Sequence, residues 1–424
     1  MEPFARILVL ALAVATCHCF MPTSNLPARN MMVSRNIHFS ENQPLTMAFE
    51  GLFSRSSTPP KKKLCVITGT TSGLGKETAR ALLENGNYYV ICACRDVNKM
   101  EKVAEAEGFD KDSYTVLPLD LASLDSVKAF IPKLNKVKGG RALDRLVCNA
   151  AVYQPALSTP KYTADGFEEQ LQINHLSHFL LCSLLINDMK RAKDPRMVIV
   201  GSITGNDNTV GGGVVLPIAD LGDLKGLEAG GKDPIAMIDG KNFNGAKAYK
   251  DSKICNMMTI SELHKRYHES TGIVFSTMYP GCIAETQLFR EKRAWFRTLF
   301  PVFMKYVTGG YVGEQEAGQR LAQVVDDDVC SKSGVYWAWN GGAQTVGYKD
   351  WNGQVKGAGG SGGKIFENNP SQKVLDEQKA ETMFELSTKV VGAKWPATKV
   401  SLKKVVNKSA PTKKSSSNKE PALV

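Results

Sequence analysis

The chain has 424 residues, of which 43% are hydrophobic and 22% charged, enough for one large or two ordinary folded domains. Its net charge of +11 is concentrated at the ends, with +4 on residues 1–63, +6 on residues 396–424 and +1 between them. A nearly neutral middle argues against a nucleic-acid-binding domain, whose basic face normally dominates its own charge.

The first 60 residues have the composition of targeting segments. Residues 1–19 combine Arg6 with the apolar run Ile7–Ala15, as a secretory signal peptide does, and the run is too short to span a bilayer. Residues 20–60 are rich in Ser, Thr, Asn, Pro and Met and poor in acidic residues, like a transit peptide. A signal followed by a transit-like stretch that starts with Phe20 resembles the two-part leader of algae with complex plastids. We therefore expect a plastid protein, with ordinary secretion as the alternative.

From Lys61 onward, strand-like apolar runs alternate with helical patterns. Strands are expected at 64–68, 88–94, 116–119, 143–148, 197–201 and 273–279, and helices at 74–84, about 97–107 and about 123–136. This alternation predicts one α/β domain over 61–395, with a doubly wound, Rossmann-like parallel sheet and helices on both faces. The glycine-rich run Gly353–Gly363 is expected to be a flexible loop or insertion, and 396–424 a disordered basic tail.

Eight of the ten cysteines lie beyond the leader, several of them inside apolar runs such as Leu64–Ile67. Cysteines in such runs are typical of small buried hydrophobic residues in a reducing compartment rather than of a disulfide framework. No Cys-x-x-Cys pair with metal-ligand spacing occurs, so we expect no metal site.

The segment Thr68–Gly75 (TGTTSGLG) follows a predicted strand and opens a predicted helix, the context of a dinucleotide-binding loop. Gly69 would permit the tight turn, Gly73 the approach of a pyrophosphate, and Gly75 close packing of helix on strand. The free N–H groups of the helix start favour phosphate. The residues between the glycines, Thr71, Ser72 and Leu74, are expected to belong to the same cofactor site.

Arg95 ends the second predicted strand, where an acidic residue would select NAD through its ribose hydroxyls. An arginine can instead bind the additional phosphate of NADP with two hydrogen bonds. Lys99 could add a second charge. The sequence therefore favours NADPH as cofactor, and the alternative for each residue is an ordinary surface cation.

The Gly-xxx-Gly-x-Gly spacing resembles the short-chain dehydrogenase/reductase family, and further segments agree with it. The resemblance implies cofactor contacts for Asp120 and Leu121, and for Asn149, Ala150 and Ala151 in the place of an Asn-Ala-Gly motif. It implies a structural and proton-relay role for Asn174. For His175 and His178, one turn apart, packing or capping is expected rather than catalysis.

Tyr249 and Lys253 stand four residues apart, which on a helix places both on one face. An ammonium beside a phenol lowers its pKa and suits it to proton transfer, and the lysine can also bind the nicotinamide ribose. An isolated pair of this kind occurs by chance, but here it follows a nucleotide site. The family resemblance adds a substrate-orienting hydroxyl at Ser202 and a turn, Pro280-Gly281, that packs beside the nicotinamide.

Ser202 and Tyr249 are 47 residues apart, which leaves an unusually long insertion over 206–246. This insertion and the strings LVCNAAVY (146–153), AYKDSKICN (248–256) and YPGCIAET (279–286) resemble the light-dependent NADPH:protochlorophyllide oxidoreductases. The resemblance covers about 62–395 and implies that light drives hydride transfer from NADPH to the ring D double bond of protochlorophyllide. Tyr249 or a nearby donor would supply the proton, Lys253 would orient NADPH, and Tyr279 and Cys282 would contact the pigment, with Cys282 also affecting catalysis.

Residues 284–315 mix aromatic and basic side chains, which predicts an apolar lid with cations near the pigment carboxylates. The same side chains could meet the plastid or thylakoid membrane as a peripheral contact, or simply cover the core. The sequence leaves homo-oligomer formation open. The competing functions are a dark NADPH-dependent carbonyl reductase acting on a retinoid or steroid-like substrate, and a catalytically silent NADP-binding or membrane-scaffold protein.

Overall fold

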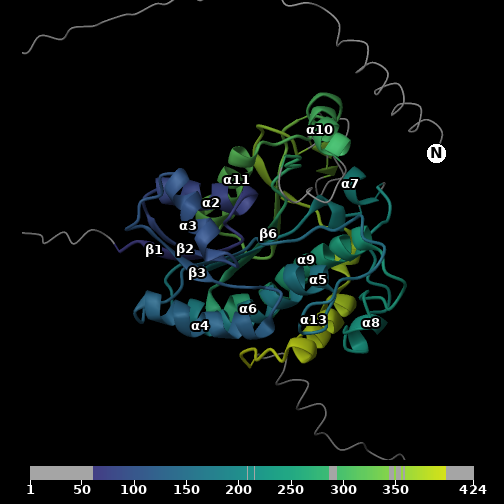
Figure 1. Cartoon of the computed structure of the whole chain (residues 1–424), viewed down its shortest axis with the longest axis horizontal. Helices are drawn as coiled ribbons and strands as arrows, with labels where there is room; N and C mark the ends of the chain where they lie inside the picture. Colours follow the sequence, from purple (N-terminus) through teal and green to yellow (C-terminus); the bar gives the residue numbers. More distant parts are fainter. Residues whose placement is uncertain are drawn as a thin grey trace, which may run out of the picture. The chain divides into compact units, whose positions relative to one another are not determined.

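The computed structural model describes residues 61–207, 209–213, 215–285, 294–342, 348–349, 355–356 and 359–397 (Figure 1). The predicted leader, 1–60, lies outside the described residues, as does nearly all of the predicted tail. So do residues 286–293 of the predicted lid.

The strands of the main sheet are β1 (Lys63–Thr68), β2 (Tyr88–Cys94), β3 (Tyr114–Pro118), β4 (Arg145–Cys148), β5 (Arg196–Val200), β6 (Val274–Met278), β7 (Val335–Trp339) and β10 (Ile365–Asn368). They lie in the order β10-β7-β6-β5-β4-β1-β2-β3. All neighbours pair in parallel except β10, which runs antiparallel to β7 at one edge. The predicted doubly wound parallel sheet is confirmed, with two strands more than expected.

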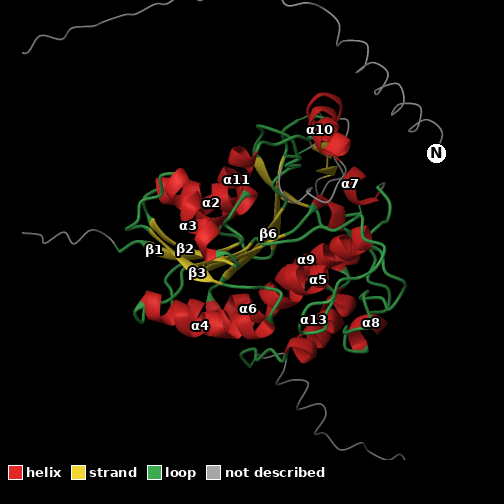
Figure 2. Ribbon diagram, in the orientation of Figure 1, coloured by secondary structure: helices red, strands yellow, loops and turns green. Residues whose placement is uncertain are grey.

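Helices cover both faces of the sheet (Figures 1 and 2). On one face lie α2 (Gly73–Glu84), α3 (Val97–Ala106) and α11 (Glu314–Asp326), and on the other α4 (Leu124–Lys138), α6 (Ser177–Met189) and α9 (Gly245–Thr271), with α13 (Glu377–Val391) packed on α9. Along β1, Leu64 and Val66 join the core under α4, α6 and α9, whereas Cys65 and Ile67 join the core under α2 and α11. A strand buried on both faces needs a continuous apolar run, which is what its sequence supplies.

The chain order of the strands reverses at β1, whose neighbours are β2 and β4. In open parallel sheets the ligand crevice lies beyond the carboxyl ends of the strands at such a switch point. Gly69 directly follows β1 and Asn149 directly follows β4. The fold therefore brings the predicted dinucleotide loop and the Asn149 segment to the same edge.

The insertion over 206–246 includes two short helices, α7 (Val210–Gly213) and α8 (Lys225–Glu228). The predicted lid contains α10 (Ala294–Phe303), which continues into a π-helical turn, Met304–Thr308. None of the described helices is both long and apolar enough to cross a bilayer. The eight cysteines that the structure describes are all free, and seven of them are buried, which confirms their role as small core residues.

The glycine-rich run Gly353–Gly363 is predicted to be a flexible loop or insertion, and its described residues are held by neighbouring segments. Two of them, Val355–Lys356, form the strand β9, which pairs with β8 (Tyr348–Lys349). Residues 359–363 are fixed by Arg320, which donates hydrogen bonds to the carbonyls of Gly359, Gly360 and Gly362. Their composition suggested freedom, but a buried cation satisfies their backbone.

Candidate active site

At two positions of the dinucleotide loop there is no room for a side chain larger than that of glycine. Gly69 has φ +75° and lies so close to Ala150 that a Cβ would come within 2.9 Å of that residue. A Cβ on Gly75 would come within 2.3 Å of the Gly69 carbonyl oxygen and 2.5 Å of Asn149 Nδ2. No larger side chain fits at Gly75 without moving the loop, so the first turn of α2 lies directly against the end of β1.

The end of β1 is joined to the segment after β4 by hydrogen bonds. The backbone N–H groups of Asn149 and Ala150 donate to Thr68 Oγ1 at 2.9 and 3.0 Å. Asn149 Nδ2 donates to the Thr68 carbonyl at 2.9 Å. The Thr68 hydroxyl is also 2.9 Å from His178 Nε2. Asn149 thus fixes the backbone at the start of the glycine loop. Ala151, two residues later, is half-buried.

The N-terminus of α2 suits a phosphate. Its N-cap, Ser72, is extended and makes no side-chain hydrogen bond to the helix, whereas Asp96, Ser123 and Asn244 cap α3, α4 and α9 with their side chains. The first N–H groups of α2 are therefore not occupied by a side-chain cap and can bind an anion. Thr71, Ser72 and Leu74 are half-buried in this loop, and Gly73 has φ +57°.

The residues predicted to contact the far half of the cofactor lie just after β2 and β3 and in the first turn of α3. Arg95 and Lys99 are exposed, and Arg95 directly follows β2, so its position fits a phosphate contact. Asp120 Oδ1 accepts from Ala122 N at 3.0 Å. The Leu121 side chain packs in the core and its carbonyl accepts from Ser177 Oγ. For Leu121, the backbone remains the part that could face a cofactor.

Tyr249 and Lys253 lie one turn apart on α9, and both are buried. The Lys253 Nζ donates to the Val200 carbonyl at the end of β5 at 3.0 Å and lies 5.6 Å from the centre of the Tyr249 ring. The helix and the strand end together fix the predicted pair in one place. Burial lowers the pKa of Lys253 to about 8, because a buried ammonium loses its hydration.

Ser202, the hydroxyl residue predicted from the family pattern, lies near enough to the Tyr249 phenol to lower its pKa, and its own Oγ is 2.9 Å from Thr204 Oγ1. Burial raises the pKa of Tyr249 well above its ordinary value, Tyr153 and Cys282 raise it further, and Ser202 opposes them. The net direction is opposite to the predicted lowering by Lys253, whose Nζ is turned to the Val200 carbonyl. The phenol consequently holds its proton firmly.

Tyr153 was missed as a site residue. Its ring centre lies 4.6 Å from that of Tyr249, at an interplanar angle of 52°. The sequence signal for it is its place at the end of LVCNAAVY (146–153), because the carboxyl end of β4 borders the nucleotide site.

Asn174 lies in a π-helical turn, Gln172–Leu176, just before α6. Its Nδ2 donates to the Val152 carbonyl at 3.0 Å and to Ser252 Oγ at 3.1 Å, and its Oδ1 accepts from Val152 N at 2.8 Å. It therefore links the segment after β4 to the helix of Tyr249. The neighbouring His175 and His178 are buried, and burial lowers the pKa of each to about 4, so both rings are neutral near pH 7.

After β6 the chain forms the turn Tyr279–Cys282. Tyr279 is buried, and Gly281 has φ +107°, a conformation that favours glycine. The Cys282 N–H donates to the Gly310 carbonyl at 3.3 Å, which ties this turn to the end of the lid segment. Burial raises the pKa of the Cys282 thiol to about 12, so it is a neutral thiol and not a thiolate near pH 7.

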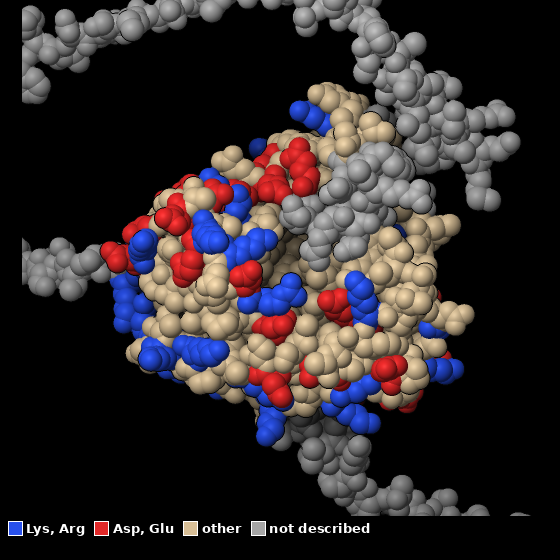
Figure 3. All heavy atoms as spheres, viewed as in Figure 1, with Lys and Arg blue, Asp and Glu red and all other residues tan. Residues whose placement is uncertain are grey.

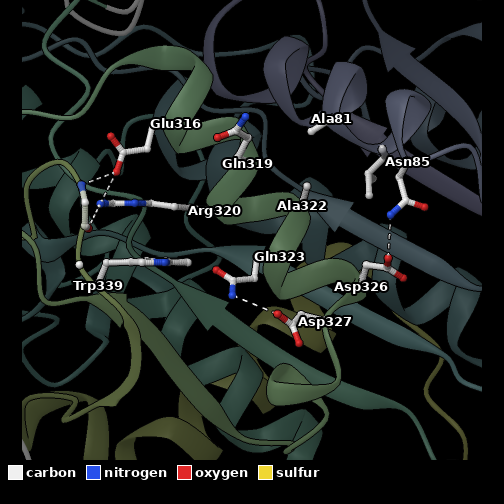
Figure 4. A pocket seen from close by; sticks show the side chains of 13 residues that line it. Ala81, Asn85, Glu316, Gln319, Arg320, Ala322, Gln323, Asp326, Asp327 and Trp339 are labelled. Atoms are coloured by element: carbon white, nitrogen blue, oxygen red, sulfur yellow. Dashed lines mark hydrogen bonds and ion pairs between the residues drawn. The ribbon is translucent and has the colours of Figure 1, made fainter.

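A hollow of about 540 Å³ lies elsewhere, between α2, α11 and the end of β7 (Figure 4). None of the predicted site residues lines it. Its polar groups pair with one another: Asn85 with Asp326 at 3.2 Å, and Gln323 with Asp327 at 3.1 Å. The Asn85–Asp326 bond joins α2 to α11, whereas the Gln323–Asp327 bond lies within the end of α11.

Comparison with known proteins gives the family of the chain. The family model for short chain dehydrogenase matches residues 63–214. The chain is 53% identical over 347 residues to protochlorophyllide reductase A, chloroplastic, of Arabidopsis thaliana, covering 80% of each chain. It is 53% identical over 335 residues to protochlorophyllide reductase, chloroplastic, of Marchantia paleacea, covering 78% of this chain and 68% of that one.

Among solved structures, an uncharacterised protein from Mycobacterium paratuberculosis superposes with a TM-score of 0.51 at 22% identity, covering 79% of this chain and 95% of that one. This likeness concerns the fold alone. The extent of identity to the plant enzymes is much greater than a shared fold requires, and the chain therefore belongs to the protochlorophyllide reductases of the short-chain dehydrogenase family.

Proposed function

We propose that this chain reduces protochlorophyllide to chlorophyllide a with NADPH, in a light-dependent step of chlorophyll synthesis inside the plastid. The observation that carries the proposal is 53% identity across 80% of the chain to a chloroplastic protochlorophyllide reductase. The site supports it, because Ser202, Tyr249 and Lys253 are held together at the strand ends beyond the glycine loop.

Each part of the site has a role in this proposal. NADPH supplies the hydride when bound. The N–H groups at the start of α2 bind its pyrophosphate, Arg95 and Lys99 bind its additional phosphate, and Asp120 and Asn149 border its adenosine half. Lys253 orients the nicotinamide ribose, and Pro280-Gly281 packs beside the ring.

Tyr249 donates the proton to the substrate carbon next to the one that gains hydride. Its raised pKa keeps the phenol protonated until that carbon is basic enough to take the proton. Ser202 keeps the hydroxyl oriented, and Asn174 joins α9 to the segment after β4. Tyr279 and Cys282 contact the pigment.

The test is an absorption spectrum of the purified protein with NADPH and protochlorophyllide, recorded in darkness and again after one flash. We expect no conversion before the flash and a chlorophyllide band after it. Conversion of the pigment in darkness, or dark turnover of a retinoid or steroid carbonyl, would favour the carbonyl reductase instead.

We also propose that α10 makes a peripheral membrane contact. Leu299, Val302 and Tyr306 are exposed and spaced along one side of the helix and the turn that follows it. Uncharged atoms predominate over α10 in Figure 3, and Lys305 is an exposed cation beside them. Such a stripe suits the boundary between acyl chains and anionic head groups.

Co-sedimentation with phosphatidylglycerol vesicles checks this contact, with V302E as the variant. We expect the protein to pellet with these vesicles and V302E to stay in solution. If V302E leaves pelleting unchanged but shifts the sedimentation coefficient in lipid-free solution, the stripe binds a second copy of the chain instead.

A further inference from the structure

The side chain of Arg320, on α11, makes several hydrogen bonds and has no role in the mechanism proposed above. It is 4% exposed. Its Nη1 donates to the Pro280 carbonyl at 2.8 Å and to the Gly359 carbonyl at 3.2 Å. Its Nη2 donates to the carbonyls of Gly360 and Gly362 at 2.7 and 2.9 Å. The guanidinium also lies over Trp339, 5.2 Å from the ring centre (Figure 4).

Glu316, one turn earlier, completes this arrangement. Its Oε1 accepts from Arg320 Nη2 at 2.7 Å and from the Gly362 N–H at 2.8 Å, and its Oε2 accepts from Ser361 Oγ at 2.6 Å. In this pair the guanidinium of Arg320 therefore binds backbone carbonyls, and the carboxylate of Glu316 binds a backbone N–H and a hydroxyl. A planar guanidinium carries five N–H donors in a fixed arrangement, so it can bond several carbonyls and a carboxylate at once.

The segment 359–363 is packed directly against the turn after β6. A Cβ on Gly281 would come within 2.8 Å of the Gly359 carbonyl oxygen and 2.2 Å of the Val312 side chain. The Ser361 N–H donates to the Tyr311 carbonyl at 2.9 Å. The turn Pro280–Cys282 is thus enclosed between 310–312 and 359–361, and Arg320 bonds to the turn and to 359–362 at once.

We propose that Arg320 is a positioning residue for the reductase reaction. Its hydrogen bonds fix the position of the Pro280–Cys282 turn relative to the nicotinamide and the pigment. This inference rests on the proposed function, which places that turn at both ligands. A shift of the turn would misplace the reacting atoms without disturbing the distant contacts to phosphate. Substitution of Arg320 is therefore expected to change kcat and the surroundings of the nicotinamide, and to leave the affinity for NADPH nearly unchanged.

The test compares R320K with R196K in the full chain. Arg196 is 2% exposed and its Nη1 donates to the Asp327 carbonyl at 2.7 Å, but it starts β5, at the opposite edge of the sheet. Three quantities are measured: the melting temperature, the emission of bound NADPH in darkness without pigment, and kcat in saturating light.

We expect R320K to change the emission of bound NADPH and to lower kcat at least about tenfold, because small misplacements of reacting groups are costly. Its Kd for NADPH should stay within about threefold of wild type, since the phosphate contacts are untouched. R196K should lower the melting temperature alone. If R320K behaves like R196K, Arg320 is a structural residue and the proposal is overturned.

E316Q is the second variant, in case R320K does not fold. The substitution keeps the size of the side chain, removes the charge that pairs with Arg320, and replaces one of the two accepting oxygens by an amide donor. We expect a smaller change of emission and kcat in the same direction; a change in melting temperature alone would contradict the proposal. A wild-type protein that binds NADPH but leaves the pigment unreduced in light would contradict the proposed function, while the emission comparison would still decide the role of Arg320.

Discussion

Lys253 gives the site a dependence on pH that differs from that of an ordinary lysine. Because burial lowers its pKa to about 8, its charge is lost as pH rises through that value. If the ammonium assists proton release from Tyr249, kcat should fall by up to about tenfold per pH unit above this point. The measurement is kcat against pH at saturating light, NADPH and pigment, with K253M as the control that should be slow at every pH.

The expected fall of kcat at high pH cannot be explained by unfolding that results from the deprotonation of Lys253. The group has an ordinary pKa of 10.5 in the unfolded chain and about 8 in the folded one, so between these values the unfolded chain binds more protons. Its contribution to the free energy of unfolding therefore rises with pH in this window. A wild-type kcat that stays constant to pH 9.5 would remove the ammonium from the proton-transfer step.

Arg95 should decide the choice between the two nicotinamide cofactors. A charge-assisted hydrogen bond contributes about 1.5–3 kcal/mol, so R95A should raise the Kd for NADPH by roughly 10- to 100-fold and leave that for NADH unchanged. K102A is the matched control, because Lys102 is an exposed cation on the adjacent α3. Equal losses for both cofactors would exclude the phosphate contact; titration by NADPH fluorescence measures each constant.

The site residues that sequence could identify are those whose chemistry depends on local spacing. Gly69 and Gly75 are recognisable because one tight turn needs glycine at both positions. Tyr249 and Lys253 are recognisable because a spacing of four places them on one face of a helix. Tyr153 and Arg320 escaped because their partners come from other parts of the chain: Tyr153 contacts Tyr249 of α9, and Arg320 bonds to loops 40 residues away on either side. In sequence Arg320 looks like half of an ordinary helix ion pair with Glu316.

At the scale of elements, α9 does more than carry Tyr249 and Lys253. Lys247, in its first turn, binds Asp239 Oδ2 at 3.0 Å and Asp251 Oδ2 at 2.6 Å. Lys250 donates to the carbonyls of Val215 and Pro217. The helix that holds the proton donor therefore also anchors the insertion 206–246, so the insertion and the site are built on one rigid element.

Removing the Lys247 ammonium should destabilise the protein strongly. K247M leaves the carboxylates of Asp239 and Asp251, which are 1% and 2% exposed, without their shared cation. Loss of one partner of a buried ion pair costs about 3–5 kcal/mol. K128M, which breaks the exposed pair with Asp125, should cost less than about 1 kcal/mol. Urea unfolding measures both, and equal losses would contradict the anchoring role.

The six predicted strands were recognisable because each is an apolar run followed by a turn or helix signal. The strands β7 and β10 were not predicted, and neither were α11 and α13. The strand β10 is only half-buried at the sheet edge and follows a glycine-rich segment, so its sequence, IFEN, lacks a core pattern. β7 is an unbroken apolar run, VYWAW, and its signal was present but unused.

At the scale of the whole molecule, the first described strand lies close to the point where the composition changes. The described residues from Lys62 onward belong to one compact unit, and β1 begins at Lys63. β1 is a central strand, paired with β2 on one side and β4 on the other. The boundary predicted at Lys61 and the start of this central strand therefore differ by only two residues.

This boundary leads to a sharp prediction for truncation. A chain that starts at Lys61 should keep its melting temperature and its light-driven turnover, because it retains β1 whole. A chain that starts at Ile67 loses Leu64, Cys65 and Val66, all at most 2% exposed, together with the strand that joins the two halves of the sheet. Burying one such side chain contributes about 1.5–3 kcal/mol, so this shorter chain should not fold. Circular dichroism melting and flash conversion measure both, and turnover by the chain that starts at Ile67 would show that β1 is dispensable.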